Sequence, residues 1–343
     1  MAAATSTVPR STPPVSSRGR TCSTVRPKAS CGADVLVAGL SIPCRHAFVR
    51  RSGPPPGDAG PPEPRGFAVD APAFLSRAGD GATIAYRRTE GRGALASPTV
   101  VFLPGFRSDM EGGKALALEA WCRAEGRGFL RFDYTGHGLS SGAFEDGTIG
   151  QWAADAVFAV ESLTSGPVVL VGSSMGGWIM MLAARALAER NGPDRVAPQW
   201  VAPQWVAGLV GVAPAPDFTE DLIMANASPA LRRDLERDGV HYEPSDYSDE
   251  PTPITRRLIE DGRERLVLRA PFPFAGPVRI VQGMADPDVP WRHALRVADA
   301  FAGADVEILL VKSGDHRLSE PDDLARLVRV TGEVCRLAAA KES

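Results

Sequence analysis

The fold of this chain is restricted most by a regular alternation, starting near residue 67, of short aliphatic runs with helix-length segments. Runs rich in β-branched and aliphatic residues predict buried parallel strands. They are Thr99–Leu103, Phe129–Phe132, Val168–Val171, Val206–Val212, Val278–Val281 and Val306–Val311. The segments between and after them predict helices. These are Lys114–Glu125, Ile149–Leu163, Met175–Glu189, Trp291–Phe301 and Pro321–Ala338. This alternation predicts an α/β protein with a mostly parallel, doubly wound sheet.

A stretch of about sixty residues between the strands Val206–Val212 and Val278–Val281 breaks this rhythm. Its short helical patterns indicate a small inserted cap over residues 214–276. The patterns cover Phe218–Ala225, Pro229–Arg237 and Ile254–Arg269. Just before the cap, the string VAPQW at 196–200 is repeated at 201–205, which we interpret as a local duplication in a surface loop.

A G-x-S-x-G frame follows the strand Val168–Val171 directly, in the string Gly172–Gly177 (GSSMGG). A strand, this frame and a helix in succession are typical of a nucleophile elbow, in which small residues permit a sharp turn. Ser174 is the serine with glycine two residues before and two after it, where a side chain would collide with the turn. Ser174 is therefore the candidate nucleophile, and a purely structural Gly/Ser turn is the alternative.

A serine hydroxyl needs a base that takes its proton, and a carboxylate that orients the base. His316 follows the last predicted strand and is the candidate base. The other histidines are His46 near the N-terminus, His241 in the cap, His293 at the start of a helix, and His137 in a turn expected near the pocket.

The candidate acid lies after the strand Val278–Val281, where both Asp286 and Asp288 occur. We favour Asp286, three residues before Val289, because a carboxylate close to the strand end meets the imidazole Nδ1 more readily. Asp288 remains the alternative. The resulting order of serine, aspartate and histidine is that of α/β-hydrolases.

Hydrolysis through a tetrahedral intermediate also needs N–H donors for the oxyanion. One candidate is the backbone N–H of Met175, which follows the nucleophile at a helix N-terminus. The other is the N–H of Phe106, in the turn after the strand Thr99–Leu103. An ordinary Pro-Gly turn is the alternative explanation of that segment.

Composition excludes several other classes of protein. The chain of 343 residues has 38 Lys and Arg against 41 Asp and Glu, so it lacks the basic surface that binds nucleic acid. It has no apolar run of the roughly 18 residues that a membrane span requires. Beyond residue 66 the cysteines are Cys122 and Cys335, which form no disulfide framework and no paired metal spacing. We therefore predict neither a metal nor an organic cofactor.

Residues 1–66 differ in composition from the rest of the chain. They contain nine Lys and Arg, three Asp and Glu, and eleven of the thirty prolines. This acid-poor, hydroxyl-rich mixture predicts a disordered leader, namely an organellar transit peptide for a mitochondrion or a plastid, with a Pro-rich linker over residues 54–64. The alternative is a misplaced start codon and a cytoplasmic protein. Residues 67–343 would form the hydrolase domain.

Several strings together resemble one known family. They are Phe102–Phe106 (FLPGF), Lys114–Ala117 (KALA), Arg131–Tyr134 (RFDY), Gly172–Trp178, Gly283-Met284, Val289–Trp291 and Asp315–Arg317. The chain resembles the α/β-hydrolase family, and within it the group called domain-containing protein ten and its bacterial relatives. Members of that group are mitochondrial palmitoyl-protein thioesterases that also cleave acyl glucuronides. The resemblance implies an α/β-hydrolase fold with Ser174 as nucleophile, Asp286 as acid and His316 as base.

The predicted function is that of a serine hydrolase for carboxylic esters or thioesters, working through an acyl-enzyme on Ser174. The substrate would be a small-molecule acyl ester or an S-acylated protein. The alternatives are a general small-molecule carboxylesterase and a catalytically silent α/β-hydrolase that only binds a ligand.

The cap departs from the resemblance and carries two features of its own. Its apolar residues would either line an acyl pocket or pack the cap onto the sheet. They are Phe218, Leu222, Ile223, Met224, Leu231, Leu266, Leu268, Phe272 and Phe274. The acidic run Ser245–Glu250 is typical of a solvated loop.

Overall fold

The computed structural model describes residues 71–190, 206–245 and 250–340. The leader predicted over 1–66, the VAPQW duplication at 196–205 and most of the acidic run lie outside these described residues. Contacts along the chain divide it after Gly66, and the unit described below is Phe67–Ser343.

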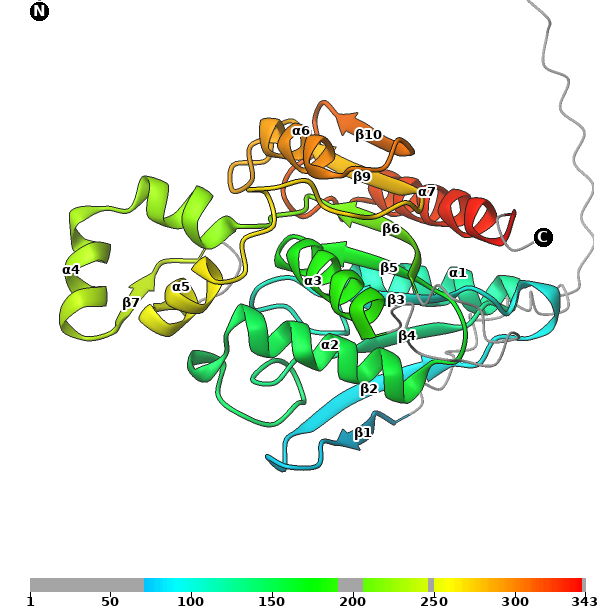
Figure 1. Ribbon diagram of the computed structural model, residues 1–343, viewed down its shortest axis with the longest axis horizontal. Coiled ribbons are helices and arrows are strands. Elements are labelled where there is room, and N and C mark those ends of the chain that lie inside the picture. Colours follow the sequence, from blue (N-terminus) through cyan, green and yellow to red (C-terminus); the bar gives the residue numbers. More distant parts are fainter. Residues whose placement is uncertain (1–70, 191–205, 246–249, 341–343) are drawn as a thin grey trace, which may run out of the picture. The chain divides into compact units, whose positions relative to one another are not determined.

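Strands of one large sheet form the centre of this unit (Figure 1). In spatial order they are β1 (Ala73–Ser76), β2 (Thr83–Thr89), β4 (Phe129–Phe132), β3 (Thr99–Leu103), β5 (Val168–Ser173), β6 (Val206–Val212), β9 (Val278–Gly283) and β10 (Val306–Val311). β1 and β2 pair antiparallel, as do β2 and β4, and every other pair in this sheet is parallel. All six predicted strands are confirmed, with ends that differ by at most two residues. The mostly parallel α/β sheet is confirmed with them.

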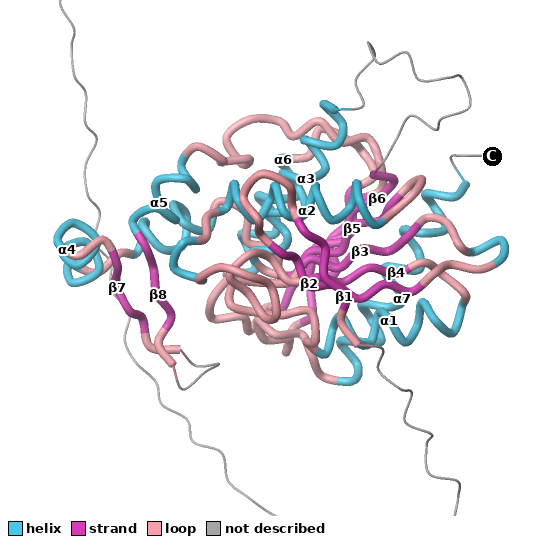
Figure 2. Tube along the Cα trace, turned by 90° about the horizontal axis from the view of Figure 1, so that it is seen from below, coloured by secondary structure: helices cyan, strands magenta, loops and turns pink. Residues whose placement is uncertain are grey.

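Helices cover both faces of this sheet, as Figure 2 shows. α1 (Gly113–Glu125) and α7 (Pro321–Ala340) lie on one side. α2 (Ile149–Leu163), α3 (Met175–Arg190) and α6 (Trp291–Ala300) lie on the other. All five match the predicted helices to within two residues. Within the described residues, none of the helices combines the length and the apolar character that a membrane span requires.

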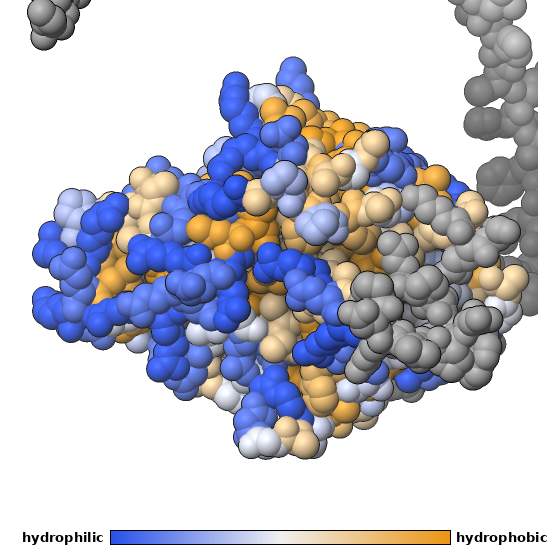
Figure 3. All heavy atoms as spheres, in the orientation of Figure 1, coloured by the Kyte–Doolittle hydropathy of each residue, from blue (hydrophilic) through white to orange (hydrophobic). Residues whose placement is uncertain are grey.

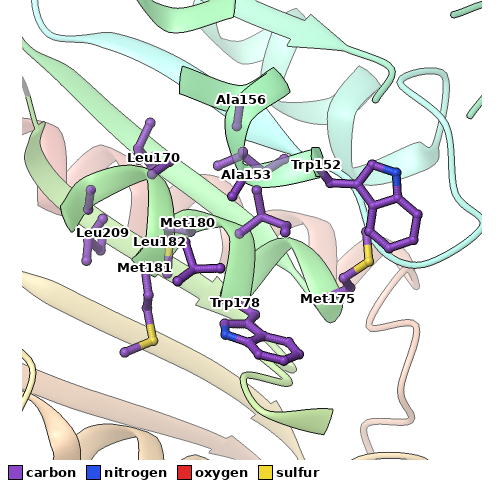
Figure 4. Close-up of a cluster of buried hydrophobic side chains, with 14 of the residues drawn as sticks. Trp152, Ala153, Ala156, Leu170, Met175, Trp178, Met180, Met181, Leu182 and Leu209 are labelled. Atoms are coloured by element: carbon purple, nitrogen blue, oxygen red, sulfur yellow. The ribbon is translucent and has the colours of Figure 1, made fainter. Parts of the chain in front are cut away.

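Strand β5 explains why a continuous aliphatic run predicts a central parallel strand. Alternate side chains of a strand point to opposite faces of the sheet. Val169 and Val171 pack with residues of α1 and α7, whereas Val168 and Leu170 pack with residues of α2 and α3. Figure 4 shows Leu170 among side chains from α2 and α3 in this second cluster. Both faces of β5 are buried, and its first four residues, Val168–Val171, are all aliphatic.

The sequence reasoning missed β1 and β2 at one edge of the sheet. Three of the four β1 residues are exposed, and one of them, Phe74, is 55 % exposed. β2 carries Arg87 and Arg88 in its second half. Strands at a sheet edge with one or both faces in solvent do not form a continuous aliphatic run, so the criterion that found the central strands does not detect them.

The segment between β6 and β9, which we call the cap, contains short helices and one hairpin (Figure 1). Its elements are the π-helical turn η3 (Thr219–Ile223), the 3-10 turn η4 (Met224–Asn226), α4 (Pro229–Arg237), the paired strands β7 (Val240–Glu243) and β8 (Thr252–Thr255), and α5 (Arg256–Arg263). The helix predicted over Pro229–Arg237 is confirmed. Ser228 caps it by accepting a hydrogen bond from the Leu231 N–H.

The helix predicted over Ile254–Arg269 was wrong at both ends. Its first two residues belong to β8, because Ile254 and Thr255 are β-branched and pair with β7. Thr255 then accepts a hydrogen bond from the Leu258 N–H and starts α5, which ends at Arg263. The helix predicted over Phe218–Ala225 is replaced by the two short turns η3 and η4.

Asp217 ties the two ends of the cap together. It follows β6, its side chain is fully buried, and it accepts hydrogen bonds from the N–H groups of Val267 and Leu268 at 2.8 and 2.9 Å. Trp178 of α3 adds a hydrogen bond from its indole Nε1 to the carbonyl oxygen of Arg265 at 3.1 Å. These bonds hold the start and the end of the cap close to the sheet.

Candidate active site

Ser174 lies at the sharp turn between β5 and α3. Its φ of +54° is in the left-handed region, which non-glycine residues adopt only where the surroundings impose it. A Cβ on Gly172 would lie 2.3 Å from the Gly176 carbonyl oxygen, and one on Gly176 would lie 2.1 Å from that of Leu103. Both positions therefore require glycine, which is the steric reason expected for the G-x-S-x-G frame.

The structure brings Ser174, His316 and Asp286 together in a chain of hydrogen bonds. His316 follows β10, and its Nε2 lies 3.0 Å from the Ser174 Oγ. The other ring nitrogen, Nδ1, lies 2.9 Å from the Asp286 Oδ2. The Asp286 side chain is fully buried, whereas the His316 side chain is 15 % exposed. The nucleophile candidate is thus connected through an imidazole to a carboxylate.

The turn after β9 separates the two candidate acids. Asp286 Oδ1 accepts hydrogen bonds from the N–H groups of Asp288 and Val289, at 2.9 and 2.8 Å. The carboxylate therefore closes a turn over the next three residues, and this turn directs Oδ2 toward His316. Asp288 is exposed and borders the cavity. The spacing from Asp286 to Val289 has a structural reason, since Val289 supplies one of these N–H donors.

Phe106 and Met175, the two candidate oxyanion donors, both border the cavity that contains Ser174. Within the described residues, neither backbone N–H donates a hydrogen bond to another protein group. Gly105 brings the loop after β3 against the elbow, because a Cβ there would lie 3.3 Å from the Ser174 Cβ. The two N–H groups thus belong to adjoining segments beside the serine.

Two side chains at the end of β4 hold the loop that carries Phe106. Asp133 Oδ1 accepts a hydrogen bond from the Met110 N–H at 2.7 Å, and Arg131 Nη1 donates one to the Met110 carbonyl oxygen at 2.8 Å. Both side chains are about 1 % exposed. The sequence reasoning assigned neither of them a role, although both stand at the carboxyl end of a predicted strand.

The cavity around Ser174 has a volume of about 610 Å³ and a mixed lining. Its apolar lining residues include Phe106, Met175, Phe218, Leu222, Ile223 and Ile254. Its polar lining residues include Arg107, Lys114, Glu243, Asp288 and Arg317. Figure 3 shows hydrophilic residues over most of the cap and an apolar area where the cap meets the rest of the molecule. Such a cavity suits an amphiphilic substrate.

Only part of the apolar set expected in the cap borders this cavity. Phe218, Leu222 and Ile223 do so. Phe272 and Phe274 instead pack against Phe301, with ring centroids 5.5 and 6.4 Å away. Met224 and Leu231 belong to a small cluster inside the cap, and Leu266 and Leu268 pack against the main core. Of the two alternatives, packing therefore applies to these residues and lining applies to Phe218, Leu222 and Ile223.

Lys114, at the start of α1, is one of the polar residues that line the cavity. Burial, together with the charge of Arg317, lowers the pKa of Lys114 from 10.5 to about 8. Its Nζ donates a hydrogen bond to the Arg317 carbonyl oxygen at 2.5 Å. Arg317 follows His316 directly, so Lys114 supports the loop of the candidate base and carries positive charge into the cavity below about pH 8.

The remaining histidines of the described residues lie apart from Ser174. His137 is buried against Phe144 and Trp152, in the turn where it was expected. His293 is buried at the start of α6 and bonds to the Pro216 carbonyl oxygen, while His241 of β7 contacts acidic side chains. His46 lies outside the described residues. Of the described histidines, His316 is the one that lies within hydrogen-bond distance of the Ser174 Oγ.

Asp286, Asp288 and His316 each offer one ligand atom within 4.8 Å of the others, a grouping that a metal ion would also accept. Both carboxylate oxygens of Asp286 already accept hydrogen bonds, and both ring nitrogens of His316 are within hydrogen-bond distance of a partner. A metal would have to displace these bonds.

The parallel sheet, the elbow at the carboxyl end of β5 and the inserted cap define the class of α/β-hydrolases. The sequence profile described as the Alpha/beta hydrolase family matches residues 100–327, and the chain belongs to this family. The resemblance predicted from the sequence strings is thereby confirmed.

Individual relatives agree with this classification. The chain is 39 % identical over 258 residues to the mitochondrial palmitoyl-protein thioesterase ABHD10 of Bos taurus, covering 75 % of this chain and 77 % of that protein. A solved structure from Agrobacterium vitis is 40 % identical with a TM-score of 0.70, covering 77 % of this chain and 98 % of that one. The alpha/beta hydrolase domain-containing protein 10 from mouse is 33 % identical with a TM-score of 0.66, covering 80 % and 100 %.

Proposed function

We propose that the protein is a serine hydrolase that cleaves carboxylic esters or thioesters through an acyl-enzyme on Ser174. One observation carries the proposal, namely that hydrogen bonds connect these three side chains. The Ser174 Oγ lies 3.0 Å from the His316 Nε2, and the His316 Nδ1 lies 2.9 Å from the Asp286 Oδ2. A nucleophile, a base and an orienting carboxylate in this arrangement activate a serine at neutral pH.

In the first half of the reaction, His316 Nε2 takes the hydroxyl proton while the Ser174 Oγ bonds to the acyl carbon. The backbone N–H groups of Phe106 and Met175 stabilise the oxyanion that forms. Collapse of this intermediate breaks the bond from the acyl carbon to the leaving oxygen or sulfur, which takes the proton from His316. Asp286 keeps the proton on Nδ1, so that Nε2 is free to act as the base.

In the second half, water replaces the leaving group. His316 removes one proton from the water, whose oxygen bonds to the acyl carbon of the ester on Ser174. The second tetrahedral intermediate collapses by breaking the bond to the Ser174 Oγ, which regains its proton from His316. The products are a carboxylic acid and the free enzyme, so the cycle consumes one water and no cofactor.

The cavity supports an amphiphilic acyl substrate. We place the acyl chain against the apolar lining residues Phe218, Leu222 and Ile223 of the cap. The relatives named palmitoyl-protein thioesterase support an S-acylated protein as one substrate. The polar lining residues Lys114 and Arg317 support acyl glucuronides as a second candidate, because a cationic side chain suits their carboxylate.

A mitochondrial location is supported by two observations. The relatives named palmitoyl-protein thioesterase carry the word mitochondrial in their names. Residues 1–66 have the basic, acid-poor composition of a transit peptide. We propose that this segment is a leader and that residues 67–343 form the mature hydrolase. A fluorescent reporter fused to residues 1–66 tests the proposal, since plastid or cytosolic fluorescence would contradict it.

The function is tested by kcat/KM for a long-chain acyl thioester, a p-nitrophenyl ester and an acyl glucuronide. The full chain should hydrolyse at least one of them, and Ser174→Ala should lose about 10⁴-fold or more while keeping its circular dichroism spectrum. Ser165→Ala is the matched control, because Ser165 is an exposed serine between α2 and β5. A folded wild type that binds these esters without hydrolysing any of them would instead be a ligand-binding protein.

A further inference from the structure

Gln282 is a fully buried amide on β9, the strand that leads to Asp286. Its Nε2 lies within hydrogen-bond distance of three oxygens. These are the Asp286 Oδ2 at 3.0 Å, the Val289 carbonyl oxygen at 3.1 Å and the Gly283 carbonyl oxygen at 3.1 Å. A single side chain therefore touches the strand end, the turn and the carboxylate that faces His316.

The surroundings determine which way this amide is oriented. An amide nitrogen carries two hydrogens and donates, whereas the amide oxygen only accepts. If the Gln282 amide were rotated by 180°, its oxygen would face three other oxygens with no hydrogen between them. The observed orientation instead leaves the Gln282 Oε1 buried without a partner among the described residues. A buried polar atom without a partner is destabilising, so the contacts of Nε2 must offset that loss.

We infer that Gln282 is a positioning residue that holds the Asp286 carboxylate in line with His316. The Asp286 Oδ2 accepts from Gln282 on one side and from His316 Nδ1 on the other. The Asp286 Oδ1 is held by the backbone of its own turn, so Gln282 is the side chain that fixes the second oxygen. This inference rests on the proposed function, in which Asp286 orients the base.

The same contact affects the charge balance of the site. The Gln282 N–H group points the positive end of its dipole at the Asp286 carboxylate. This dipole partly offsets the negative charge of the carboxylate that faces His316. Asp288 adds a second carboxylate, since its ligand atom lies within 4.8 Å of those of Asp286 and His316. Without the Gln282 donor, the Asp286 Oδ2 would lose one of its two side-chain partners, and the carboxylate would be held less firmly in line with the imidazole.

Two substitutions of Gln282 in the full chain test this role. Gln282→Met keeps the length of the side chain and removes its donor, and Gln282→Leu removes the donor with a shorter apolar side chain. Thr331→Val is the control, because Thr331 of α7 is equally buried and its hydroxyl has no partner among the described residues. One readout is the rate at which a fluorophosphonate labels the enzyme as a function of pH. A second is the low-field proton NMR signal of the His316 Nδ1–H, which needs no substrate.

For Gln282→Met we expect labelling at pH 7 to slow by about tenfold, because the donor to the Asp286 carboxylate is lost. For Gln282→Leu we expect a loss of similar size, because this side chain also lacks the donor. In both variants the low-field signal should shift or broaden, whereas Thr331→Val should match the wild type in every readout.

Two results would overturn the role of Gln282. One is a Gln282→Leu protein that keeps the wild-type labelling rate and NMR signal, because a side chain that only fills space tolerates an apolar replacement. The other is a Gln282→Met protein that changes only in thermal stability. A wild type that resists the fluorophosphonate would contradict the proposed function instead, and the NMR signal would still decide whether Gln282 positions Asp286.

Discussion

Acid is expected to destabilise the folded protein through His137, a histidine that is only 3 % exposed. Its ring packs edge-on against Tyr134, Phe144 and Trp152, with ring centroids 5.5, 5.0 and 5.0 Å away. Burial, with an addition from the charge of Arg107, lowers the pKa of His137 from 6.5 to about 4. The folded protein therefore keeps this imidazole neutral over a range where the unfolded chain protonates it.

The sign and the size of the effect follow from proton linkage. Between pH 6.5 and about 4, the unfolded chain binds a proton at His137 and the folded chain does not, so stability decreases as the pH falls. A difference of about 2.5 pH units corresponds to about 3 kcal/mol of stability that is present at neutral pH and lost near pH 4. A protonated ring would also have a donor at Nε2 with no acceptor among the described residues.

Urea unfolding of the wild type and of His137→Phe at pH 7 and pH 4 measures this contribution. Phenylalanine suits the aromatic surroundings and does not titrate, while other buried groups such as His293 contribute equally to both proteins. The stability of the wild type should fall relative to the variant by about 3 kcal/mol between the two pH values. Equal losses in the two proteins would refute the reasoning, because His137 would then not be held neutral by burial.

Two further predictions concern the site itself. Asp286→Asn should lower kcat by about 10⁴-fold through the wrong tautomer of His316, whereas Asp288→Asn should stay within about tenfold of the wild type in the same ester assay; the reverse order would identify Asp288 as the acid. If Leu222 borders the acyl site, kcat/KM should rise with chain length by up to about 0.8 kcal/mol per methylene, and Leu222→Trp should shorten the optimum; a profile that is flat in both proteins would mean that the acyl chain binds elsewhere.

The central part of the fold was predictable because burial on both faces leaves a simple signal. The strands Val168–Ser173 and Val206–Val212 are aliphatic along most of their length, so composition alone identifies them. The strand Thr83–Thr89, next to the edge strand of the sheet, mixes apolar and charged residues, and the cap hairpin combines VHYE with TPIT, so neither forms such a run. These segments form strands because they pair with partners elsewhere in the chain, and a local sequence pattern does not reveal such pairing.

The site was predictable to the extent that chemistry requires particular residue types at strand ends. The three strands that precede Ser174, Asp286 and His316 have their carboxyl ends at one edge of the sheet. The position of each residue directly after its strand was therefore sufficient to group the three. Gln282 and Lys114 gave no comparable signal. Gln282 depends on how the turn after β9 folds back toward its own strand, and Lys114 depends on a contact with the carbonyl oxygen of Arg317, about two hundred residues away.

The central claim is that the acyl group is transferred to Ser174. Mass spectrometry of the protein and of its peptides tests this claim most directly. The enzyme is mixed with a long-chain acyl thioester, quenched with acid within the first turnover, and digested to locate any adduct. We predict a mass increase equal to the acyl group, on the peptide that contains Ser174, and neither adduct nor turnover in a folded Ser174→Ala protein. Turnover in Ser174→Ala within tenfold of the wild type, or an adduct located on another residue, would contradict the account.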